Sequence, residues 1–303
     1  MTAPTAARRF RCVHCGGDAR LSSEGNSPRC LSCEKSYSIA DGIVALTEAV
    51  DDRDYPAALV DLVAGVERRH FWFAARNDVI LSTIRRVIGT VAGLRVLDIG
   101  CGTGFVTEAL ERAGMDAWGI DMHRAALMHA RPRIRGPLFS NHATTLPFFR
   151  DFDLVSLFDV IEHLDDDVGA IRQAATVLKP HGCVVVTVPA GQRLWTKYDE
   201  VIGHKRRYDR QGLTDVLRNA GLEMAYVGYF SCLPLLAQVV QRWIAPGMRA
   251  PSSDTIEIVR QALTVPPEPL NVLFRSSIRA EAPLRQLSWV RGGSLIAVAR
   301  RSD

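Results

Sequence analysis

The fold is decided by the stretch Val96-Leu-Asp-Ile-Gly100-Cys-Gly102-Thr-Gly104. A short apolar strand over 94–99 runs directly into three glycines at alternate positions, and a helix is expected from Phe105 to Ala113. A strand, a glycine turn and a helix in this order form a crevice for a phosphate or nucleoside at the carboxyl end of a parallel sheet. Glycine suits this turn because a side chain would keep the ligand away from the backbone. The turn alone fits a dinucleotide equally well.

Two acids next to this turn narrow the choice of ligand. Asp98 stands two residues before the first glycine, and Asp121 ends the next expected strand, 17 residues beyond Gly104. A carboxylate at that place can accept hydrogen bonds from both ribose hydroxyls. The runs "VLDIGCGTG" and "GID" together resemble motifs I and II of class I S-adenosylmethionine (SAM)-dependent methyltransferases. The resemblance implies SAM as cofactor, with these contacts: Asp98, Gly100, Gly102, Gly104, Asp121, Met122 and Phe158.

Strands and helices continue to alternate along the chain. The expected strands are 152–158, 183–188, 224–229 and 294–300, and the expected helices are 165–178 and 212–221. Apolar strands that alternate with helices predict a parallel sheet covered on both faces. We therefore expect a Rossmann-like α/β fold with a seven-stranded, mostly parallel sheet, and the resemblance implies that the last strand is antiparallel.

The sequence divides into three parts. Residues 1–48 are expected to form a small zinc ribbon, 49–93 a linker and helices that lid the cofactor, and 94–303 the methyltransferase domain. Within the last part, 231–290 is an insertion rich in proline. The resemblance implies that this insertion caps the substrate pocket, and the alternative is a packing elaboration without substrate contact.

Four of the seven cysteines form two CxxC pairs separated by 14 residues. Two such turns direct four thiolates at one point, which is the tetrahedral arrangement that Zn²⁺ prefers. We expect Cys12, Cys15, Cys30 and Cys33 to hold a structural zinc ion, and a degenerate ribbon without metal is the alternative. The following segment, 37–46, resembles the end of Trm112-like zinc ribbons.

Three further runs resemble one bacterial group of methyltransferases, usually assigned to small molecules, natural products or cell-envelope precursors. They are "ERRHFWFAAR" at 67–76, "LFDVIEHL" at 157–164 and "LWTKYDEVIGHKRRY" at 194–208. His70, Trp72 and Arg76 are expected at the cofactor, where Arg76 would clamp the methionine carboxylate. The aromatic residues at 71–73 could instead only pack their helix. His142 occupies the slot where relatives carry an acid for the adenine amino group.

Methyl transfer to a hydroxyl needs a base beside the acceptor. We expect His204 in this role, with His163 next and Tyr208 also at the site, because histidine titrates near neutral pH. Asp159, Glu162 and His163 form a D-x-x-E-H run, which resembles the E-x-x-E-H of metal-using methyltransferases in RNA 3′-end and ubiquinone pathways. With His204 they would bind Mg²⁺ or another divalent ion. Alternatively, the glutamate and histidine only cap the following helix.

The composition argues for a protein of ordinary charge. Lys and Arg number 37 against 33 acids, a formal charge of +4, which does not demand a nucleic-acid partner. The amino terminus has no apolar signal region, and the apolar run 230–245 is interrupted by polar residues. We expect a cytoplasmic protein without a transmembrane segment, and a homodimer is left open.

Three functions remain open. The first is SAM-dependent methylation, most simply at oxygen, of a small molecule, natural product or cell-envelope precursor. The second is RNA methylation with the ribbon contacting RNA, although no NPPY-like signature follows the expected fourth strand. The third is a partner-binding module with weak or no activity. The sequence does not identify the acceptor, which insertion 231–290 would select.

Overall fold

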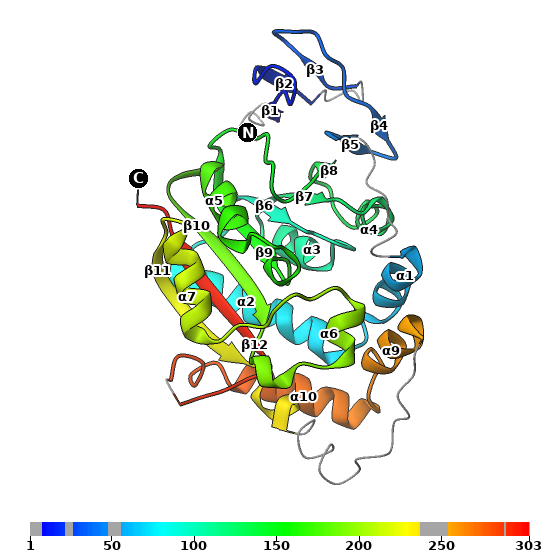
Figure 1. Cartoon of the computed structure of the whole chain (residues 1–303), viewed down its shortest axis with the longest axis vertical. Helices are drawn as coiled ribbons and strands as arrows, with labels where there is room; N and C mark the ends of the chain where they lie inside the picture. Colours follow the sequence, from blue (N-terminus) through cyan, green and yellow to red (C-terminus); the bar gives the residue numbers. More distant parts are fainter. Residues whose placement is uncertain (1–7, 22–26, 48–55, 237–253, 288, 303) are drawn as a thin grey trace.

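The computed structural model describes residues 8–21, 27–47, 56–236, 254–287 and 289–302. The linker expected at 49–55 and the central part of the insertion, 237–253, lie outside the described residues. A sheet of nine strands in the order β11-β12-β10-β9-β6-β7-β8-β5-β4 forms the centre (Figure 1). Its strands are β4 Ile39–Ala40, β5 Ile43–Ala45, β6 Arg95–Ile99, β7 Asp116–Asp121, β8 Leu138–Ser140, β9 Phe152–Phe158, β10 Leu178–Pro189, β11 Glu223–Phe230 and β12 Ser294–Arg300.

Six of these strands were expected at these places in the sequence, and β8 completes the seven strands of the expected sheet. Strands β8, β7, β6, β9 and β10 are parallel neighbours, and β12 lies antiparallel between β10 and β11. The expected α/β fold with an antiparallel last strand is thus confirmed. Because the strands are parallel, the carboxyl ends of β6, β7, β8, β9 and β10 meet at one edge of the sheet, which we call the carboxyl edge; the opposite one is the amino edge.

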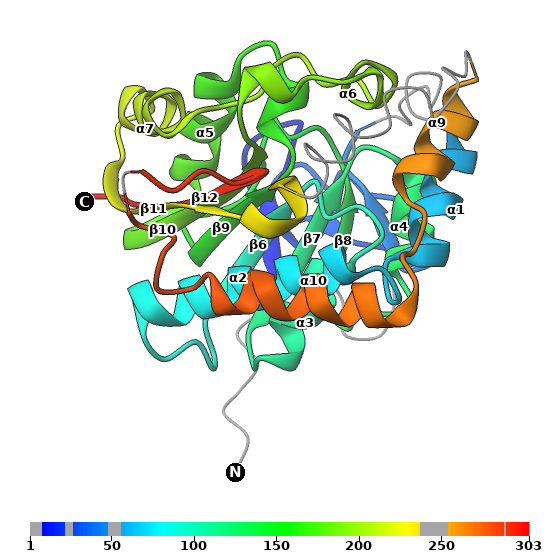
Figure 2. The same ribbon diagram turned by 90° about the horizontal axis from the view of Figure 1, so that it is seen from below.

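Helices cover both faces of the sheet (Figure 2). Helices α2 Phe71–Ile88 and α3 Phe105–Arg112 lie on one face, and α5 Asp167–Thr176 and α7 Arg210–Asn219 lie on the other. Successive side chains of a strand point to opposite faces. In β6, accordingly, Val96 packs in the cluster beneath α2 while Leu97 packs in the cluster beneath α5 and α7.

The amino-terminal segment forms a three-stranded antiparallel sheet of β1 Arg9–Arg11, β2 Asp18–Arg20 and β3 Arg29–Cys30. Its core is continuous with that of the main sheet, because the Phe10 ring meets Tyr37 at 5.0 Å and Phe139 of β8 at 5.8 Å between centroids. The Arg11 amide also donates to the Pro147 carbonyl at 2.6 Å. This small sheet is therefore packed into the fold as one of its layers.

The last part of the expected ribbon segment forms two strands that join the main sheet, which the sequence did not predict. Strand β5 pairs in parallel with β8, so that Ile43 lies opposite Leu138, and β4 pairs antiparallel with β5. An uncovered edge strand presents unpaired N–H and C=O groups. The β4–β5 hairpin provides partners for the edge of β8, and the sheet has nine strands where seven were expected.

The described part of insertion 231–290 contains two helices with different neighbours. Helix α9 Thr255–Ala262 packs against α1 Ala57–Val66 and α6 Lys197–Val201, whereas α10 Glu268–Ala280 packs along α2 (Figures 1 and 2). Asn271 of α10 accepts from the Phe71 amide at 2.8 Å and so stabilises the start of α2. None of the described helices has the length and apolar character needed to span a bilayer.

Candidate active site

The glycine turn lies at the carboxyl edge, between β6 and α3. All three glycines have left-handed backbone, with φ of 69° at Gly100, 55° at Gly102 and 79° at Gly104. A Cβ atom would lie 2.5 Å from the Val160 side chain at Gly100, and 2.9 Å from the Ala130 Cβ at Gly104. At Gly102 such an atom would meet nothing within 4 Å. Gly100 and Gly104 thus permit close packing, whereas Gly102 faces open space where a ligand can approach.

Asp98 lies beneath the turn and is nearly inaccessible, at 1% exposure. Its two oxygens accept from the Thr107 hydroxyl at 2.5 Å and from the Ser156 hydroxyl at 2.8 Å. Burial raises the pKa of Asp98 to about 6. Its carboxylate therefore ties β6 to α3 and β9 from within, and the expected contact with SAM stays a prediction.

Asp121 ends β7 directly beside the turn. It accepts from the Gly102 amide at 2.8 Å and from the His123 amide at 2.8 Å. Burial raises the pKa of Asp121. This carboxylate fixes the open glycine and lies where a ribose acceptor was expected, with Met122 half-buried after it. His142 is exposed in the loop after β8, and Phe158 is buried at the end of β9.

The segment before α2 is tied to the glycine turn by Glu67, which the sequence reading quoted in a motif but did not select as a site residue. Glu67 is 1% exposed, accepts from the Thr103 hydroxyl at 2.6 Å and pairs with Arg133. His70 lies close by, and its Nδ1 accepts from the Trp72 amide at 3.2 Å as the N-cap of α2. Burial lowers the pKa of His70 to about 4, so a neutral capping role explains it without a ligand.

Arg76 and Asp159 were expected to bind different ligands, but the structure pairs them with each other. The Arg76 guanidinium donates to Asp159 and lies 4.7 Å from the centroid of the Trp72 ring. Asp159 also accepts from the Thr187 hydroxyl at 3.1 Å and has a left-handed φ of 57°. The Nε atom of Arg76 still has no hydrogen-bond partner among the described residues, so the expected contacts of Arg76 with the methionine carboxylate and of Asp159 with a divalent ion stay predictions.

Three other predicted residues do come together. One donor atom each of Glu162, His163 and His204 lies within 4.8 Å of the others, and Asp159 is not among them. The Nε2 atom of His204 lies 3.8 Å from Glu162 Oε1, and the two imidazole centroids are 4.7 Å apart. The 3-10 turn Ile161–His163 supplies Glu162 and His163, and Val160, which precedes it, packs against Gly100. The cluster therefore adjoins the glycine turn.

Glu162 is fully buried, and neither of its carboxylate oxygens has a hydrogen-bond partner among the described residues. Burial and then the negative charge of Asp159 raise the pKa of Glu162 well above its usual value. Burial lowers the pKa of His163 to about 4. An unpartnered buried carboxylate is costly unless a proton or a cation meets it. One carboxylate and two imidazoles also suit a divalent transition ion.

The loop that carries His204 is organised by Asp199, which the sequence reading overlooked. Asp199 is fully buried and lies 2.8 Å from His204 Nδ1. The available signal was an acid five residues before the histidine, inside a run already singled out. Tyr208, expected at the reacting centre, donates its hydroxyl to Asp167 at 2.7 Å and is 5% exposed. Its hydroxyl anchors the loop to α5, and its expected role at the reacting centre stays a prediction.

An apolar lid lies over this edge of the sheet. Leu59 of α1, Phe73 of α2 and Val259 of α9 form one buried cluster, against which Trp72 and Phe105 also pack. Phe105 directly follows Gly104, so the lid reaches the cofactor turn. Phe71 faces the other way and meets Phe274 of α10 at 5.1 Å, so part of the aromatic run packs its helix, and lidding of the cofactor by Trp72 and Phe73 stays a prediction.

The four cysteines of the CxxC pairs gather at one point in the amino-terminal sheet, far along the chain from the glycine turn. The Sγ atoms of Cys12 and Cys33 are 3.7 Å apart, and those of Cys15 and Cys30 are 3.5 Å apart. A tetrahedral zinc site with bonds of about 2.3 Å separates its sulfurs by about 3.8 Å. The Tyr37 hydroxyl contacts Cys12 Sγ at 2.9 Å. The cluster fits a zinc ion.

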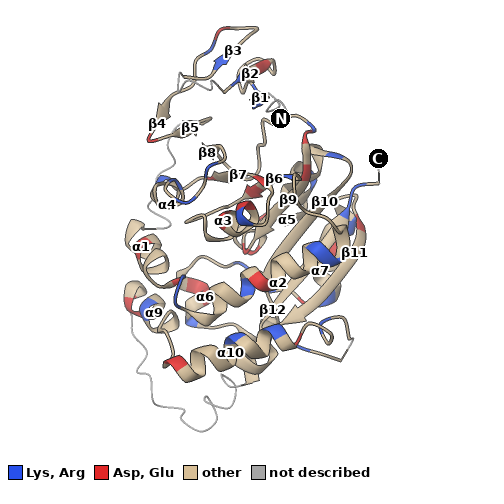
Figure 3. Cartoon of the chain, turned by 180° about the vertical axis from the view of Figure 1, so that it is seen from behind, with Lys and Arg blue, Asp and Glu red and all other residues tan. Residues whose placement is uncertain are grey.

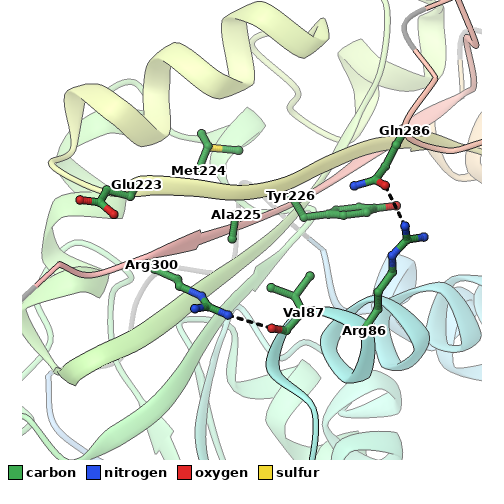
Figure 4. Close-up of a pocket in the computed structure, with 8 residues that line it drawn as sticks. All are labelled: Arg86, Val87, Glu223, Met224, Ala225, Tyr226, Gln286 and Arg300. Carbon is green, nitrogen blue, oxygen red and sulfur yellow. Dashed lines mark hydrogen bonds between the residues drawn. The ribbon is translucent and has the colours of Figure 1, made fainter.

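A separate hollow of about 450 Å³ lies where β11 passes the end of α2 (Figure 4). Its lining residues are Arg86, Val87, Glu223, Met224, Ala225, Tyr226, Gln286 and Arg300. Arg86 donates to Gln286 at 2.8 Å, and Arg300 donates to the Val87 carbonyl at 2.8 Å, which satisfies the end of α2. None of the predicted site residues lines this hollow, and we regard it as a packing seam.

The fold and the glycine turn define a class of protein. The family model described as "Methyltransferase domain" matches residues 67–227, more than half of the chain. The chain belongs to the class I SAM-dependent methyltransferases.

Curated methyltransferases are similar to part of this chain. A ubiquinone biosynthesis O-methyltransferase of Alkalilimnicola ehrlichii is 32% identical over 116 residues, which cover 36% of this chain and 47% of the relative. A probable SAM-dependent methyltransferase of Mycolicibacterium smegmatis is 28% identical over 166 residues, 54% of this chain and 63% of the relative. The chain thus spans about half the length of the curated relatives it matches.

Solved structures share the fold. A phosphoethanolamine N-methyltransferase of Haemonchus contortus in complex with SAM has a TM-score of 0.55 and 17% identity, over 84% of this chain and 61% of that one. The cyclase SpnF has a TM-score of 0.53 and 20% identity, over 81% and 93%. A shared fold does not define an acceptor.

Proposed function

We propose that this protein transfers the methyl group of SAM to a hydroxyl oxygen of a small molecule. The observation that carries the proposal is the pair of Glu162 and His204, 3.8 Å apart beside the glycine turn. A buried base next to a methyl donor is what hydroxyl methylation requires. The curated relatives named O-methyltransferase support oxygen as the acceptor atom.

Each part of the carboxyl edge has a role in this reaction. SAM supplies an electrophilic methyl group when it is bound. The backbone at Gly102 and the carboxylate of Asp121 bind the nucleoside, while the apolar lid with Phe73 excludes water. His204 presents Nε2 to the acceptor hydroxyl and takes its proton. Alignment of the two reactants can supply up to about 7–11 kcal/mol of the barrier reduction.

A divalent ion is a second use of the same cluster, favoured by the unpartnered carboxylate of Glu162. Glu162, His163 and His204 would hold the ion, which would lower the pKa of a bound hydroxyl. Treatment with EDTA, with the content of ribbon zinc measured in parallel, separates the two uses. Loss of activity that returns with added metal supports the ion, and unchanged activity supports His204 as the base.

We further propose that Cys12, Cys15, Cys30 and Cys33 hold a structural zinc ion. The ribbon lies at the amino edge, where Arg9 and Arg20 line a hollow with Arg95 and Asp116, the first residues of β6 and β7. This location supports stabilisation of the sheet and not a contact with the methyl acceptor.

The amino-edge location of the ribbon also weighs against RNA methylation and against a ribbon that covers the pocket. Acidic and basic positions are interspersed along the elements in Figure 3. The acceptor is therefore a small hydroxylated compound, such as a natural-product or cell-envelope precursor, bordered by helix α9 of the insertion. The third reading, a partner-binding module, requires weak or absent activity.

The test combines SAM binding with transfer of a labelled methyl group to a panel of phenols, catechols and RNA. Asp121→Asn should weaken SAM binding at least about tenfold, which corresponds to about 1.4 kcal/mol. Asp116→Asn, at the opposite end of the same strand, is the matched control and should leave binding unchanged. Failure of the wild-type protein to bind SAM would overturn the proposal, and salt-sensitive methylation of RNA would replace it with the second function.

A further inference from the structure

The carboxylate of Asp199, near the carboxyl edge, has hydrogen-bond partners at both of its oxygens. Its side chain is fully buried. Oδ1 lies 2.8 Å from both His204 Nδ1 and Arg207 Nε. Oδ2 accepts from the Thr196 amide at 2.8 Å, the Thr196 hydroxyl at 2.9 Å and Arg207 Nη2 at 2.9 Å. The amide and the guanidinium can only donate, so both oxygens must accept.

These contacts decide the ionisation of Asp199. The Arg207 guanidinium pairs with both oxygens, with Nε 2.8 Å from Oδ1 and Nη2 2.9 Å from Oδ2, and such a two-point pair is the geometry of an ionised carboxylate. The group is therefore a carboxylate at neutral pH. A carboxylate has no proton to donate.

The ionised state of Asp199 determines which nitrogen of His204 carries the proton. Since Oδ1 can only accept, His204 Nδ1 must donate, and in the neutral imidazole Nε2 is then the acceptor. Nε2 is the atom that faces Glu162, at 3.8 Å. The free lone pair therefore points into the cluster and not toward the loop.

The surroundings hold this arrangement rigidly. The Arg207 guanidinium donates to the Ala190 carbonyl at 3.3 Å, just beyond the end of β10. The Lys205 amide donates to the Glu162 carbonyl at 2.8 Å, and the His204 amide donates to the Asp199 carbonyl at 2.8 Å. Arg207 and Lys205, which follow His204, are thus fixed to the sheet edge and to the turn that carries Glu162.

We propose that Asp199 is a positioning residue, which fixes His204 in the tautomer with its free lone pair on Nε2 and directs that lone pair at the reacting centre. The inference rests on the proposed function, because both the base and the metal-ligand role of His204 require Nε2 to be unprotonated. It extends that function to a residue that touches neither cofactor nor acceptor.

Asp199→Asn tests the proposal while keeping the size of the side chain. The variant has a single acceptor oxygen, for which Thr196, Arg207 and His204 compete. Thr196→Val is the matched control, because it removes the other half of the capping box at the start of α6 without touching His204. A purely structural role of Asp199 in this loop would make the two variants behave alike.

The first measurement is the tautomer of His204 by ¹⁵N nuclear magnetic resonance of the whole protein, assigned with a His204→Asn sample. We expect the Nδ1–H form in the wild type and in Thr196→Val, and a mixture of both tautomers in Asp199→Asn. A wild-type His204 protonated on Nε2 would overturn the proposal. This wild-type spectrum decides the matter even if Asp199→Asn does not fold.

The second measurement separates kcat from KM. We expect Asp199→Asn to lower kcat by about 10²–10⁴-fold, the usual contribution of a positioned proton acceptor. Its KM for SAM should stay within about threefold, and Thr196→Val should change neither constant beyond that. An unchanged kcat in a variant with a mixed tautomer would overturn the positioning role. The two proposals can fail separately. If the wild type transfers no methyl group but the tautomer of His204 depends on Asp199, the proposed function is wrong and the positioning of His204 by Asp199 is still supported.

Discussion

The two edges of the central sheet treat their polar groups differently. At the amino edge, charges are paired at the first residues of the strands: Arg95 with Asp116 at 3.0 Å, and Lys179 with Asp153 at 2.8 Å. Arg9 of the ribbon joins them through Asp151 at 3.7 Å. These ion pairs hold the starts of the strands together, and the chemistry of this edge is that of a stabilised surface.

The carboxyl edge contains groups whose backbone conformation or burial is energetically unfavourable. Asp159 has a φ of 57°, Glu162 is buried without a partner among the described residues, and Gly102 faces open space. Strain and unsatisfied groups concentrate where a protein binds or reacts. We therefore expect substitutions at the amino edge to reduce stability and substitutions at the carboxyl edge to reduce activity.

The largest expected effect is at the carboxyl edge. His204→Asn places an amide nitrogen near the position of Nδ1, so the bond to Asp199 is preserved while Nε2 is lost. We expect methyl transfer to fall by about 10²–10⁴-fold, about 2.7–5.4 kcal/mol in the barrier. Measurement of kcat together with the unfolding midpoint checks this result.

Arg193→Ala is a control at the exposed start of the same loop and should retain activity. Full activity of His204→Asn, or a loss of stability in proportion to its loss of activity, would contradict the assignment of catalysis to the carboxyl edge.

The second effect is at the amino edge. Phe10 is completely buried between Tyr37 and Phe139, and Phe10→Ala should lower the free energy of unfolding by about 3–5 kcal/mol. Val13, in the first CxxC turn, is 46% exposed, so Val13→Ala should change the free energy of unfolding by less than about 0.5 kcal/mol. Urea unfolding measures both. A large loss of kcat with little loss of stability in Phe10→Ala would contradict the division between the edges.

Much of this comparison was predictable from sequence because local patterns determine it. The glycine turn at 100–104 and the acid at Asp121 have a fixed spacing, and the four cysteines lie where two CxxC turns place them. Apolar strands that alternate with helices along the chain predicted the doubly covered sheet. These features depend on residues close together in the chain.

Contacts between distant segments could not be predicted in the same way. Arg76 and Asp159 are 83 residues apart, and each has several partners compatible with its charge. Likewise, nothing in residues 39–45 indicates that this hairpin pairs with β8. Asp199 was missed for another reason, because its role depends on the buried geometry that brings Arg207 and His204 to one carboxylate.

Within the glycine turn, Gly104 and Gly102 should respond differently to the same substitution. Gly104→Ala brings a methyl group to 2.9 Å from the Ala130 Cβ at a φ of 79°, so it should destabilise the fold by about 2–4 kcal/mol. Gly102→Ala has open space and should lose only about 1–2 kcal/mol, from its left-handed backbone. It should nevertheless raise the Kd for SAM more than tenfold. Gly104→Ala should thus have the larger effect on stability, and Gly102→Ala the larger effect on SAM binding. Calorimetric binding and urea unfolding of both variants measure these effects, and equal effects of the two variants would contradict the prediction.

The smallest expected effect concerns Asp98, which is buried at the carboxyl edge but satisfied by two hydroxyl donors. Burial raises the pKa of Asp98 to about 6 from an ordinary value of 3.8. The folded state therefore binds this proton more tightly than the unfolded state. Stability from this group is greatest below pH 4 and is lost as the pH rises to about 6, by up to about 3 kcal/mol.

Asp98→Asn removes this titration while keeping an oxygen and an amide at the same place. The free energy of unfolding of the variant, relative to the wild type, should therefore increase between pH 4 and pH 7. Asp116→Asn, where the acid is paired at the amino edge, should show no such increase. Parallel curves of unfolding free energy against pH for the two variants would contradict this prediction. They would mean that the fold stabilises the carboxylate of Asp98 as well as water does in the unfolded chain, as expected for the paired acids of the amino edge.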